Sequence, residues 1–412
     1  IEIPEFHFHK VAPLFSNLPE AKQTVDIQPM EQFNQGWGTI LYRTTLPETT
    51  LAGTTLKITE VHDWAQIYAD GKLLARLDRR KGEFTTTLPA LKKGTQLDIL
   101  VEAMGRVNFD KSIHDRKGIT EKVELISGNQ TKELKNWTVY NFPVDYSFIK
   151  DKKYSDTKIL PTMPAYYKST FTLDKVGDTF LDMSTWGKGM VWVNGHAMGR
   201  FWEIGPQQTL FMPGCWLKEG ENEILVLDLK GPTRASIKGL KKPILDVLRE
   251  KAPETHRKDG EKLKLTGEKV VHEGAFTPGN GWQEVRFATL VKGRYFCLEA
   301  LSPQANDNIA AIAEFDVLGA DGKPVSREHW KIRYADSEET RSGNRTADKI
   351  FDLQESTFWM TVDNVPYPHQ LVIDLSKVEN VTGFRYLPRA EKGYPGMIKE
   401  YRVYVKPADF NY

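Results

Sequence analysis

The chain has 412 residues, of which 56 are basic and 55 acidic, and its formal net charge is +1. This balance argues against a generally basic nucleic-acid binder. With 40% hydrophobic and 27% charged residues, the composition is that of a globular protein, and the length predicts two to four domains of roughly 100–200 residues each. The sequence has no apolar run of about 18 residues that would span a membrane, and its two cysteines exclude a disulfide framework.

Runs of β-branched and aromatic residues, bounded by turn residues, predict strands along most of the first 230 residues. Asp70-Gly71 and Asn194-Gly195 each separate two such runs. Both pairs tolerate the positive φ angles that a two-residue hairpin turn requires, so each predicts a β-hairpin. The strands are expected at 55–61, 65–77, 96–103, 189–195 and 222–229.

Three strand motifs recur in the same order at a nearly constant spacing. YRTTL at residue 42 is followed 125 residues later by YKSTF, and ILVEA at residue 99 is followed 125 residues later by ILVLD. The two hairpins begin 124 residues apart, at residues 65 and 189. The spacing predicts a duplicated domain, and each copy is too long for a solenoid repeat, so each should form its own β-sandwich.

The stretch 233–261 is charged and poor in aromatic residues, and we interpret it as a connector. Leu and Ile residues at 240–251 have helical spacing, which predicts one short helix whose start Pro243 limits. Strand patterns resume at 262 and continue to 412. We therefore expect an all-β chain of three β-sandwich domains in tandem, joined by one short connecting helix.

The first 232 residues resemble the non-catalytic sandwiches of the β-galactosidases of glycoside hydrolase family 35. TWGKGMVWVNGHAMGRFWEIG, from residue 185, is similar to the family's last sandwich, and QGWGTILYRTTL and MGRVNFDKSIHDRKGI, from residues 35 and 104, resemble its first. The resemblance implies galactose-binding-like jelly rolls at 31–155 and 156–232, preceded at 1–30 by a linker or strand.

In that family a (β/α)8 barrel comes first and carries the two catalytic glutamates. This chain lacks the alternation of strands and helices that builds such a barrel. Because it begins at Ile1 rather than Met, we expect a fragment or a processed chain whose N-terminal part is missing.

Residues 262–412 resemble the discoidin-like, factor 5/8 type C domains, a group that includes galactose-binding modules. The segment that usually closes such a domain, at 282–317, here precedes the segment that usually opens it, at 330–359. One circularly permuted domain explains this order more simply than two partial domains do, because permutation is tolerated where termini lie close together.

The resemblance implies that the parent protein hydrolyses terminal β-galactosyl residues of glycans with retention and without an organic cofactor. A retaining glycosidase needs two carboxylates about 5–5.5 Å apart. Glu60 and Asp63 are the tempting pair, but they adjoin a predicted strand and the family uses this position structurally. We therefore predict no catalytic residue and no activity for this chain alone.

The expected partners are a β-galactoside-containing glycan and the catalytic barrel, with neither a nucleic acid nor a membrane span. A periplasmic or extracellular location is expected by association with sugar-binding modules. The alternative is a free-standing carbohydrate-binding or adhesion protein without enzymatic activity.

Three residues of the first jelly roll are candidates for substrate contact. The resemblance implies that the loop at 105–115 reaches towards the barrel mouth, and Phe109 stands where the family often has Tyr. An aromatic ring stacks on the apolar face of a sugar, so Phe109, with Arg106 and Asn108, is predicted to line a subsite. The alternative is that these residues only attach the sandwich to the barrel.

The third domain has a candidate calcium site. Calcium prefers six to eight oxygen ligands, and the family supplies them from a tight loop and a distant Glu, here Asp352, Gln354, Thr357 and Glu314. Leu353 replaces the usual Gly, which favours positive φ. A metal-free loop, in which Asp352 caps backbone amides, is the alternative.

Sugar contacts in the third domain are expected from side chains in loops between strands, because aromatic rings stack on sugars while Arg and His donate to hydroxyl groups. The candidates are Tyr367, His369, Arg389 and Tyr394, whereas Trp282, Trp330 and Trp359 are expected in the core.

Overall fold

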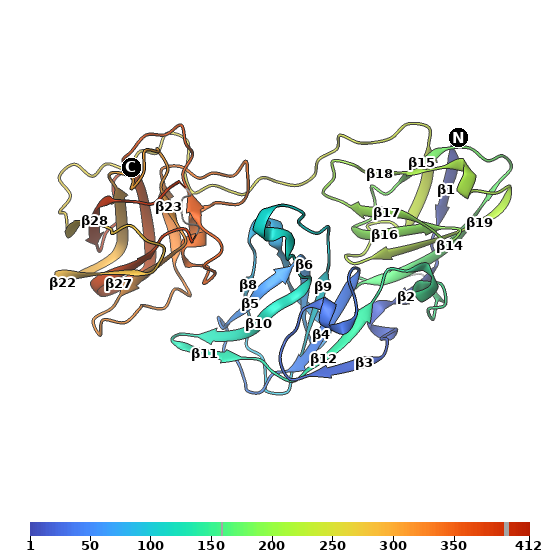
Figure 1. The fold of residues 1–412 in the computed structure, drawn as a ribbon, viewed down its shortest axis with the longest axis horizontal. Helices are drawn as coiled ribbons and strands as arrows, with labels where there is room; N and C mark the ends of the chain where they lie inside the picture. The colour runs from blue at the N-terminus through green and yellow to red at the C-terminus, as the bar shows by residue number, and fades with distance from the viewer. Residues whose placement is uncertain (158–159, 391–394) are drawn as a thin grey trace. The chain divides into compact units, whose positions relative to one another are not determined.

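The computed structural model describes residues 1–157, 160–390 and 395–412, together with the backbone but not the side chains of 110 and 111. Within these ranges the chain is nearly all β, with α1 (Tyr146–Ile149) as its only α-helix (Figure 1). The all-β prediction is confirmed. The short 3-10 helices are η1 (Leu14–Ser16), η2 (Met30–Phe33), η3 (Arg79–Lys81), η4 (Asp110–Ile113), η5 (Gly214–Trp216) and η6 (Ala347–Phe351).

The chain divides into two compact units, each made of segments that are distant in sequence. The first unit comprises 1–24, 30–42 and 138–251, and the second comprises 25–29, 43–137 and 252–412.

The first unit contains a sandwich of two sheets with strand orders β1-β20-β15-β18 and β13-β2-β14-β19-β16-β17. Its N-terminal strands pair with β20 and β14, so residues 3–13, expected as a linker or strand, form part of this sandwich. Trp186 and Tyr167 lie in its core. The strands are β1 (Ile3–His7), β2 (Lys10–Pro13), β13 (Ser155–Asp156), β14 (Ala165–Leu173), β15 (Thr179–Asp182), β16 (Lys188–Val193), β17 (His196–Trp202), β18 (Thr209–Met212), β19 (Gly220–Asp228) and β20 (Ser236–Leu240).

Two further sheets are built from the preceding part of the chain, with strand orders β3-β12-β4-β9-β6-β7 and β11-β10-β5-β8. The strands are β3 (Ala21–Thr24), β4 (Thr39–Thr45), β5 (Thr55–His62), β6 (Trp64–Ala69), β7 (Lys72–Asp78), β8 (Thr85–Thr87), β9 (Gln96–Glu102), β10 (Gly118–Ser127), β11 (Gln130–Glu133) and β12 (Trp137–Phe142).

The predicted duplication is visible in the strand order. The succession β4-β9-β6-β7 has the same neighbours as β14-β19-β16-β17, its counterpart about 125 residues later. Each copy contains the predicted hairpin, and the turn residues Asp70, Gly71, Asn194 and Gly195 all have positive φ, between 45° and 85°. These angles are those of the type I′ turn, whose twist matches that of the paired strands.

The two hairpins also share an irregularity. The register of β6 against β7 shifts between Ile67 and Tyr68, and that of β16 against β17 shifts between Val191 and Trp192, 124 residues further on. A β-bulge re-aims the side chains of a strand, so its recurrence at matched positions shows that the copies share local geometry as well as strand order.

The third domain is a single sandwich rather than two partial ones. One sheet, β21-β28-β22-β27-β24, with β25 paired to β27, unites the segments before and after residue 320, and residues 276–405 contribute to one core. Circular permutation of this domain stays a prediction. The strands are β21 (His272–Ala275), β22 (Gln283–Ala300), β23 (Ala311–Ile312), β24 (Glu314–Leu318), β25 (Lys331–Ala335), β26 (Trp359–Met360), β27 (His369–Leu387) and β28 (Glu400–Lys406).

The helix predicted at 240–251 was wrong, since residues 243–250 adopt no helical structure. The N–H groups of Val247 and Arg249 donate to the carbonyl groups of Pro206 and Ile204, at 3.0 and 2.8 Å. These bonds to a neighbouring segment replace the intrahelical ones. The helical spacing of Leu and Ile was misleading because it reflects no buried face: Leu245 and Leu248 are 54% and 64% exposed.

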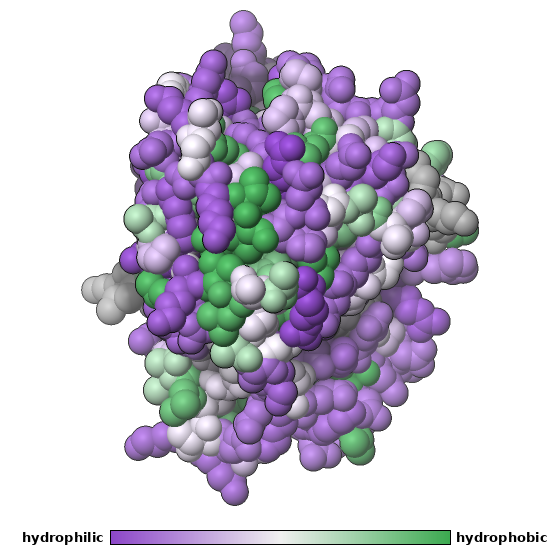
Figure 2. Space-filling view, turned by 90° about the vertical axis from the view of Figure 1, so that its left-hand side faces the viewer, coloured by the Kyte–Doolittle hydropathy of each residue, from purple (hydrophilic) through white to green (hydrophobic). Residues whose placement is uncertain are grey.

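The surface drawn in Figure 2 is mainly hydrophilic and surrounds a limited hydrophobic patch. In the described part of the chain, no helix is long and apolar enough to cross a membrane.

Candidate functional site

The loop that carries Phe109 connects β9 to β10 and has an apolar tip. Phe109 is 78% exposed, the highest value among the large hydrophobic residues described, and Val107 and Ile113 are 38% and 58% exposed. Arg106 and Asn108, the other candidates for substrate contact, are exposed as well. The three predicted residues therefore lie close together in sequence at the surface, where a ligand or partner has access.

A buried ionic cluster holds both ends of this loop. Lys117 is 0% exposed, and its Nζ lies 2.6 Å from Asp63 Oδ2 and 2.8 Å from Asp115 Oδ2. The same ammonium group donates to the carbonyl oxygen of Gly105 at 3.0 Å. Arg79 Nη1 completes the cluster, because it donates to Oδ1 of both aspartates at 2.7 Å.

The two aspartates also bind the backbone of the loop. Asp63 Oδ2 accepts the N–H of Met104 at 2.6 Å, and Asp115 Oδ2 accepts that of Val107 at 3.0 Å. Burial alone would raise the pKa of Asp115, but hydrogen bonds from Lys117, Val107 and Arg79 outweigh it and lower that pKa to about 2. Asp115 is therefore ionised at neutral pH, and the loop is fixed at both ends.

Glu60 and His62 lie at the edge of this cluster. His62 Nε2 is 3.1 Å from Glu60 Oε2, and its Nδ1 is 2.6 Å from the carbonyl oxygen of Arg116. The hydrogen bond with His62 lowers the pKa of Glu60, although burial opposes it. Asp63 therefore contacts the loop and Lys117 directly, whereas Glu60 is linked to this region through His62.

The four predicted calcium ligands gather at the loop between η6 and β26. The N–H of Gln354 donates both to Glu314 Oε1, at 2.8 Å, and to Asp352 Oδ1, at 3.0 Å. The Thr357 hydroxyl donates to Asp352 Oδ2 at 2.7 Å. Leu353 has a φ of 64°, so the loop keeps the left-handed conformation expected for Gly at this position.

Positive side chains already neutralise much of the charge at this loop. The Arg327 guanidinium donates to Glu314 and, through Nε at 2.9 Å, to Asp316. Lys349 Nζ lies 3.8 Å from Asp352 Oδ2. Burial raises the pKa of both Glu314 and Asp352, although Arg327 and Lys349 respectively oppose these shifts.

The loop offers oxygen atoms of the kinds that bind calcium, but few of them come from carboxylates. Among the described residues, no three His, Cys, Asp or Glu side chains are grouped to hold a metal. A cation here would also need hydroxyl, amide and backbone oxygens, which calcium accepts. Gln354 Oε1 is one of these, since it is buried and accepts no hydrogen bond from any residue described.

His369 was predicted at the surface, and this was wrong. The side chain is 0% exposed. Its Nδ1 lies 2.7 Å from Asp336 Oδ2, and its Nε2 lies 2.7 Å from the carbonyl oxygen of Asn308. His369 begins β27 with its ring turned into the domain, where both nitrogens find partners as buried polar groups require.

The other predicted sugar contacts are only partly accessible. Tyr367 is half-buried, and its hydroxyl donates to the carbonyl oxygen of Ile309 at 2.7 Å. Arg389 is half-buried, and its guanidinium carbon lies 4.3 Å from the centre of the Phe358 ring. Tyr394 lies outside the described residues.

Of the three tryptophans predicted in the core, Trp330 and Trp359 are buried, but Trp282 is 36% exposed. The Trp282 indole N–H donates to Glu355 at 3.3 Å, and the Arg385 guanidinium carbon lies 4.5 Å from the ring centre. Trp282 precedes β22 at the rim of the sheet. An amphipathic indole suits this position because its apolar face and its N–H both find partners there.

Models of known domains match three parts of the chain. The first all-beta domain of β-galactosidase matches 28–143, the galactose-binding domain of β-galactosidase matches 164–222, and the F5/8 type C domain matches 334–412. The chain therefore contains two domains that match those of β-galactosidases, followed by one that matches the discoidin-like F5/8 type C domain. Its F5/8 type C match begins after β22 and β24, although both strands belong to the same sheet.

Whole proteins similar to these β-galactosidase domains come from distant organisms. Human beta-galactosidase-1-like protein 2 is 34% identical over 205 residues, which are 48% of this chain and 30% of that protein. Bos taurus beta-galactosidase is 35% identical over 255 residues, or 54% and 37% of the two chains. Dictyostelium discoideum beta-galactosidase 1 is 32% identical over 246 residues, or 54% and 35%. The aligned part is thus about a third of the length of these curated relatives.

Sequence reasoning missed several functional groups of the discoidin-like and β-galactosidase domains. Arg327 belongs to no motif and meets Glu314 only through the fold. Lys117 lies within the MGRVNFDKSIHDRKGI motif, but a lysine in a loop gives no sign that it will be buried. Its position two residues after Asp115 was the one available signal, because residues at i and i+2 of an extended segment face the same side.

Proposed function

We propose that the chain is the non-catalytic region of a β-galactosidase, and that it supports the catalytic barrel of the parent protein and helps it to hold glycans. The observation that carries this proposal is the exposed tip at Val107, Phe109 and Ile113, which an ionic cluster centred on the fully buried Lys117 fixes at both ends. A rigid loop with an exposed aromatic ring is suited to a partner's surface, because docking then costs little ordering entropy.

The test compares variants of the whole gene product rather than of this chain alone. Phe109→Ser removes the ring, and Leu51→Ser, at a side chain 71% exposed in the same sandwich, is the matched control. We expect Phe109→Ser to lower kcat/KM on a chromogenic β-galactoside about tenfold, which corresponds to about 1.4 kcal/mol, and Leu51→Ser to leave it unchanged. Equal activity of the two variants would refute the docking role.

The parent reaction implied by this assignment is release of terminal β-galactosyl residues with retention, through two carboxylates of the barrel. The match to a β-galactosidase galactose-binding domain and the F5/8 type C match support carbohydrate binding by this region. A protein with such modules acts on glycans outside the cytoplasm, so we propose a periplasmic or extracellular location. Fractionation of the source cells tests it.

We also propose that Glu314, Asp352, Gln354 and Thr357 hold a structural Ca²⁺. The convergence of their polar groups on one loop and the unused Gln354 Oε1 support this. Because Arg327 and Lys349 are close to the carboxylates, we expect weak binding, with a dissociation constant of about 10⁻⁴ M. At that affinity, 10 mM Ca²⁺ would stabilise the domain by about 2.7 kcal/mol.

Thermal unfolding in Ca²⁺, Mg²⁺ and EDTA tests the calcium site. Ca²⁺ should raise the Tm of the wild-type chain, whereas Mg²⁺ should not, because Mg²⁺ demands a tighter octahedral shell. Asp352→Asn should abolish the response. Identical wild-type Tm values in Ca²⁺ and EDTA would instead support the metal-free loop.

A further inference from the structure

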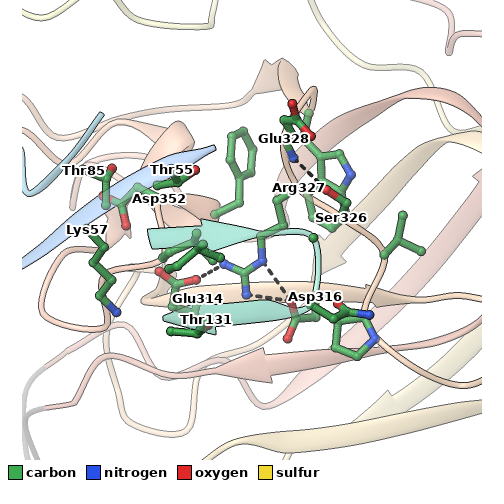
Figure 3. A pocket seen from close by; sticks show the side chains of 18 of the residues that line it. Thr55, Lys57, Thr85, Thr131, Glu314, Asp316, Ser326, Arg327, Glu328 and Asp352 are labelled. Atoms are coloured by element: carbon green, nitrogen blue, oxygen red, sulfur yellow. Dashed lines mark hydrogen bonds and ion pairs between the residues drawn. The ribbon is translucent and has the colours of Figure 1, made fainter. Parts of the chain in front are cut away.

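The second unit contains a cavity of about 550 Å³ that shares Glu314 and Asp352 with the proposed calcium site but involves neither the Phe109 loop nor the predicted sugar contacts (Figure 3). One wall is the outer face of the sheet β11-β10-β5-β8, and the other is the third domain. This volume lies within the range of about 300–1,000 Å³ that is typical of sites for small molecules.

The sheet wall carries a row of three threonine hydroxyl groups with Ile126 among them. The register places Thr131 opposite Ile126, Ile126 opposite Thr55, and Thr55 opposite Thr87. Directly opposed residues lie on the same face of a sheet, so these four side chains cross all four strands in line. Leu56, the neighbour of Thr55, is 0% exposed, which shows that the threonine row faces away from the core.

The wall from the third domain combines an aromatic ring with fixed charges. Trp282 lines the cavity beside Arg385 and Glu355. Figure 3 shows Arg327 between Glu314 and Asp316, with Lys57 and Thr55 on the side of the sheet. The ion pairs of Arg327 fix the direction of these carboxylates before any ligand binds.

Glycine and side-chain contacts hold the two walls together. Lys349 Nζ donates to the carbonyl oxygen of Gly82 at 3.3 Å, and Asn344 Nδ2 donates to that of Lys81 at 3.2 Å. A Cβ atom at Gly53 would lie 1.7 Å from Glu328 Oε1, and one at Gly82 would lie 2.8 Å from Thr357 Cγ2. The contact at Gly82 leaves little room for a side chain, whereas the Glu328 carboxylate near Gly53 could move aside.

We infer that this cavity binds a short, uncharged oligosaccharide, an inference that rests on the carbohydrate-binding role proposed above. Hydroxyl, carboxylate and guanidinium groups match the donors and acceptors of sugars, and the Trp282 ring offers an apolar face. Six acidic and three basic side chains line the cavity, which disfavours an anionic ligand. The Nε1 of buried Trp330, also in the lining, donates to no acceptor among the described residues, and a sugar hydroxyl would supply one.

Isothermal titration of the full chain with lactose and a β-1,4-linked galactotriose tests this site. Trp282→Ala removes the ring, and Trp37→Ala, at a tryptophan 48% exposed outside the cavity, is the matched control. Thr55→Val and Thr87→Val remove hydroxyl groups from the opposite wall while keeping the side-chain shape. We expect Trp282→Ala to weaken binding about tenfold, the double valine variant to weaken it about threefold to tenfold, and Trp37→Ala to bind like the wild type.

The outcomes separate the two proposals. Binding that is weakened in both cavity variants and unchanged in the Trp37 control supports the site. Wild-type binding that neither cavity variant alters would overturn this inference and leave the carbohydrate-binding role intact. Absence of wild-type binding to either sugar at millimolar concentration would overturn both. The double valine variant keeps the test decisive if Trp282→Ala fails to fold.

Discussion

Replacement of Lys117 by Met removes the charge at the centre of the buried cluster while keeping a side chain of similar length. Asp63 and Asp115 are 2% and 5% exposed, and after the substitution only Arg79 would compensate both. Loss of one partner from a buried ion pair typically costs about 3–5 kcal/mol. We expect the lower end, about 3 kcal/mol, because Arg79 still bonds both carboxylates.

Hydrogen exchange measured by mass spectrometry is the suitable assay, because the chain has several domains and local opening is the quantity of interest. A change of about 3 kcal/mol corresponds to about 100-fold faster exchange for peptides that cover 104–117. Lys132→Met is the matched control in the same sandwich. Its ion pair with Glu48 is exposed, and such pairs contribute at most about 1 kcal/mol.

The pKa of Asp115 adds a dependence on pH with a defined sign. Its pKa is about 2 in the folded chain against 3.8 for the free side chain, so it stabilises the fold above about pH 4. This contribution, about 2 kcal/mol, is lost as pH falls through 2. In Lys117→Met the loss should begin at higher pH, as near-UV circular dichroism during acid titration would show.

The reasoning would be refuted if Lys117→Met left the exchange of 104–117 and the acid transition unchanged. That result would mean that the loop keeps its position without the cluster. Similar effects of Lys117→Met and Lys132→Met would also contradict it, because burial is the only reason to expect a difference.

Three further substitutions or labels test local features. Leu353→Gly should stabilise the third domain by up to about 1 kcal/mol, because it relieves the left-handed strain at φ 64°. Leu353→Ala should give no such gain. Thermal unfolding would distinguish the two variants, and a lower Tm for the Gly variant would contradict the strain argument. Asn194→Ala should destabilise its hairpin by about 1–2 kcal/mol, because Asn194 has a positive φ and its Oδ1 accepts a hydrogen bond from the Glu223 N–H. Asn194→Gly should destabilise the hairpin less in the same assay. A thiol reagent should label the exposed Cys215 in the native chain and Cys297 only after unfolding, because Cys297 is buried and burial raises its pKa; native labelling of both would show that the core opens readily.

Local and repeated features were predictable from the sequence, whereas groups assembled by the fold were not. The turns at Asp70 and Asn194 could be predicted because the backbone φ angles that they require depend on only two residues. The duplication could be predicted because three motifs recur in the same order at a nearly constant spacing. The helix at 240–251 could not be corrected from its pattern, because the partners of its backbone are Ile204 and Pro206, about 40 residues away.

Burial of charged and polar groups was equally hidden. His369 and Lys117 are of residue types that usually lie at the surface, and only the tertiary structure provides the carboxylates that allow them to be buried. Trp282 was predicted in the core but is partly exposed, because a position next to a strand does not by itself distinguish the core from the rim of a sheet. Asp352, Gln354 and Thr357 lie together because they belong to one short segment, whereas Glu314 and the opposing Arg327 reach that segment only through the fold.

Hydrolysis of a chromogenic β-galactoside by the purified 412-residue chain tests the central claim most directly. The account predicts no turnover above the buffer rate, because Glu60 and Asp63 are engaged in structural contacts and the proposed function assigns the catalytic pair to another part of the parent protein. Clear turnover that Glu60→Gln or Asp63→Asn abolishes, in a variant shown to be folded, would contradict it.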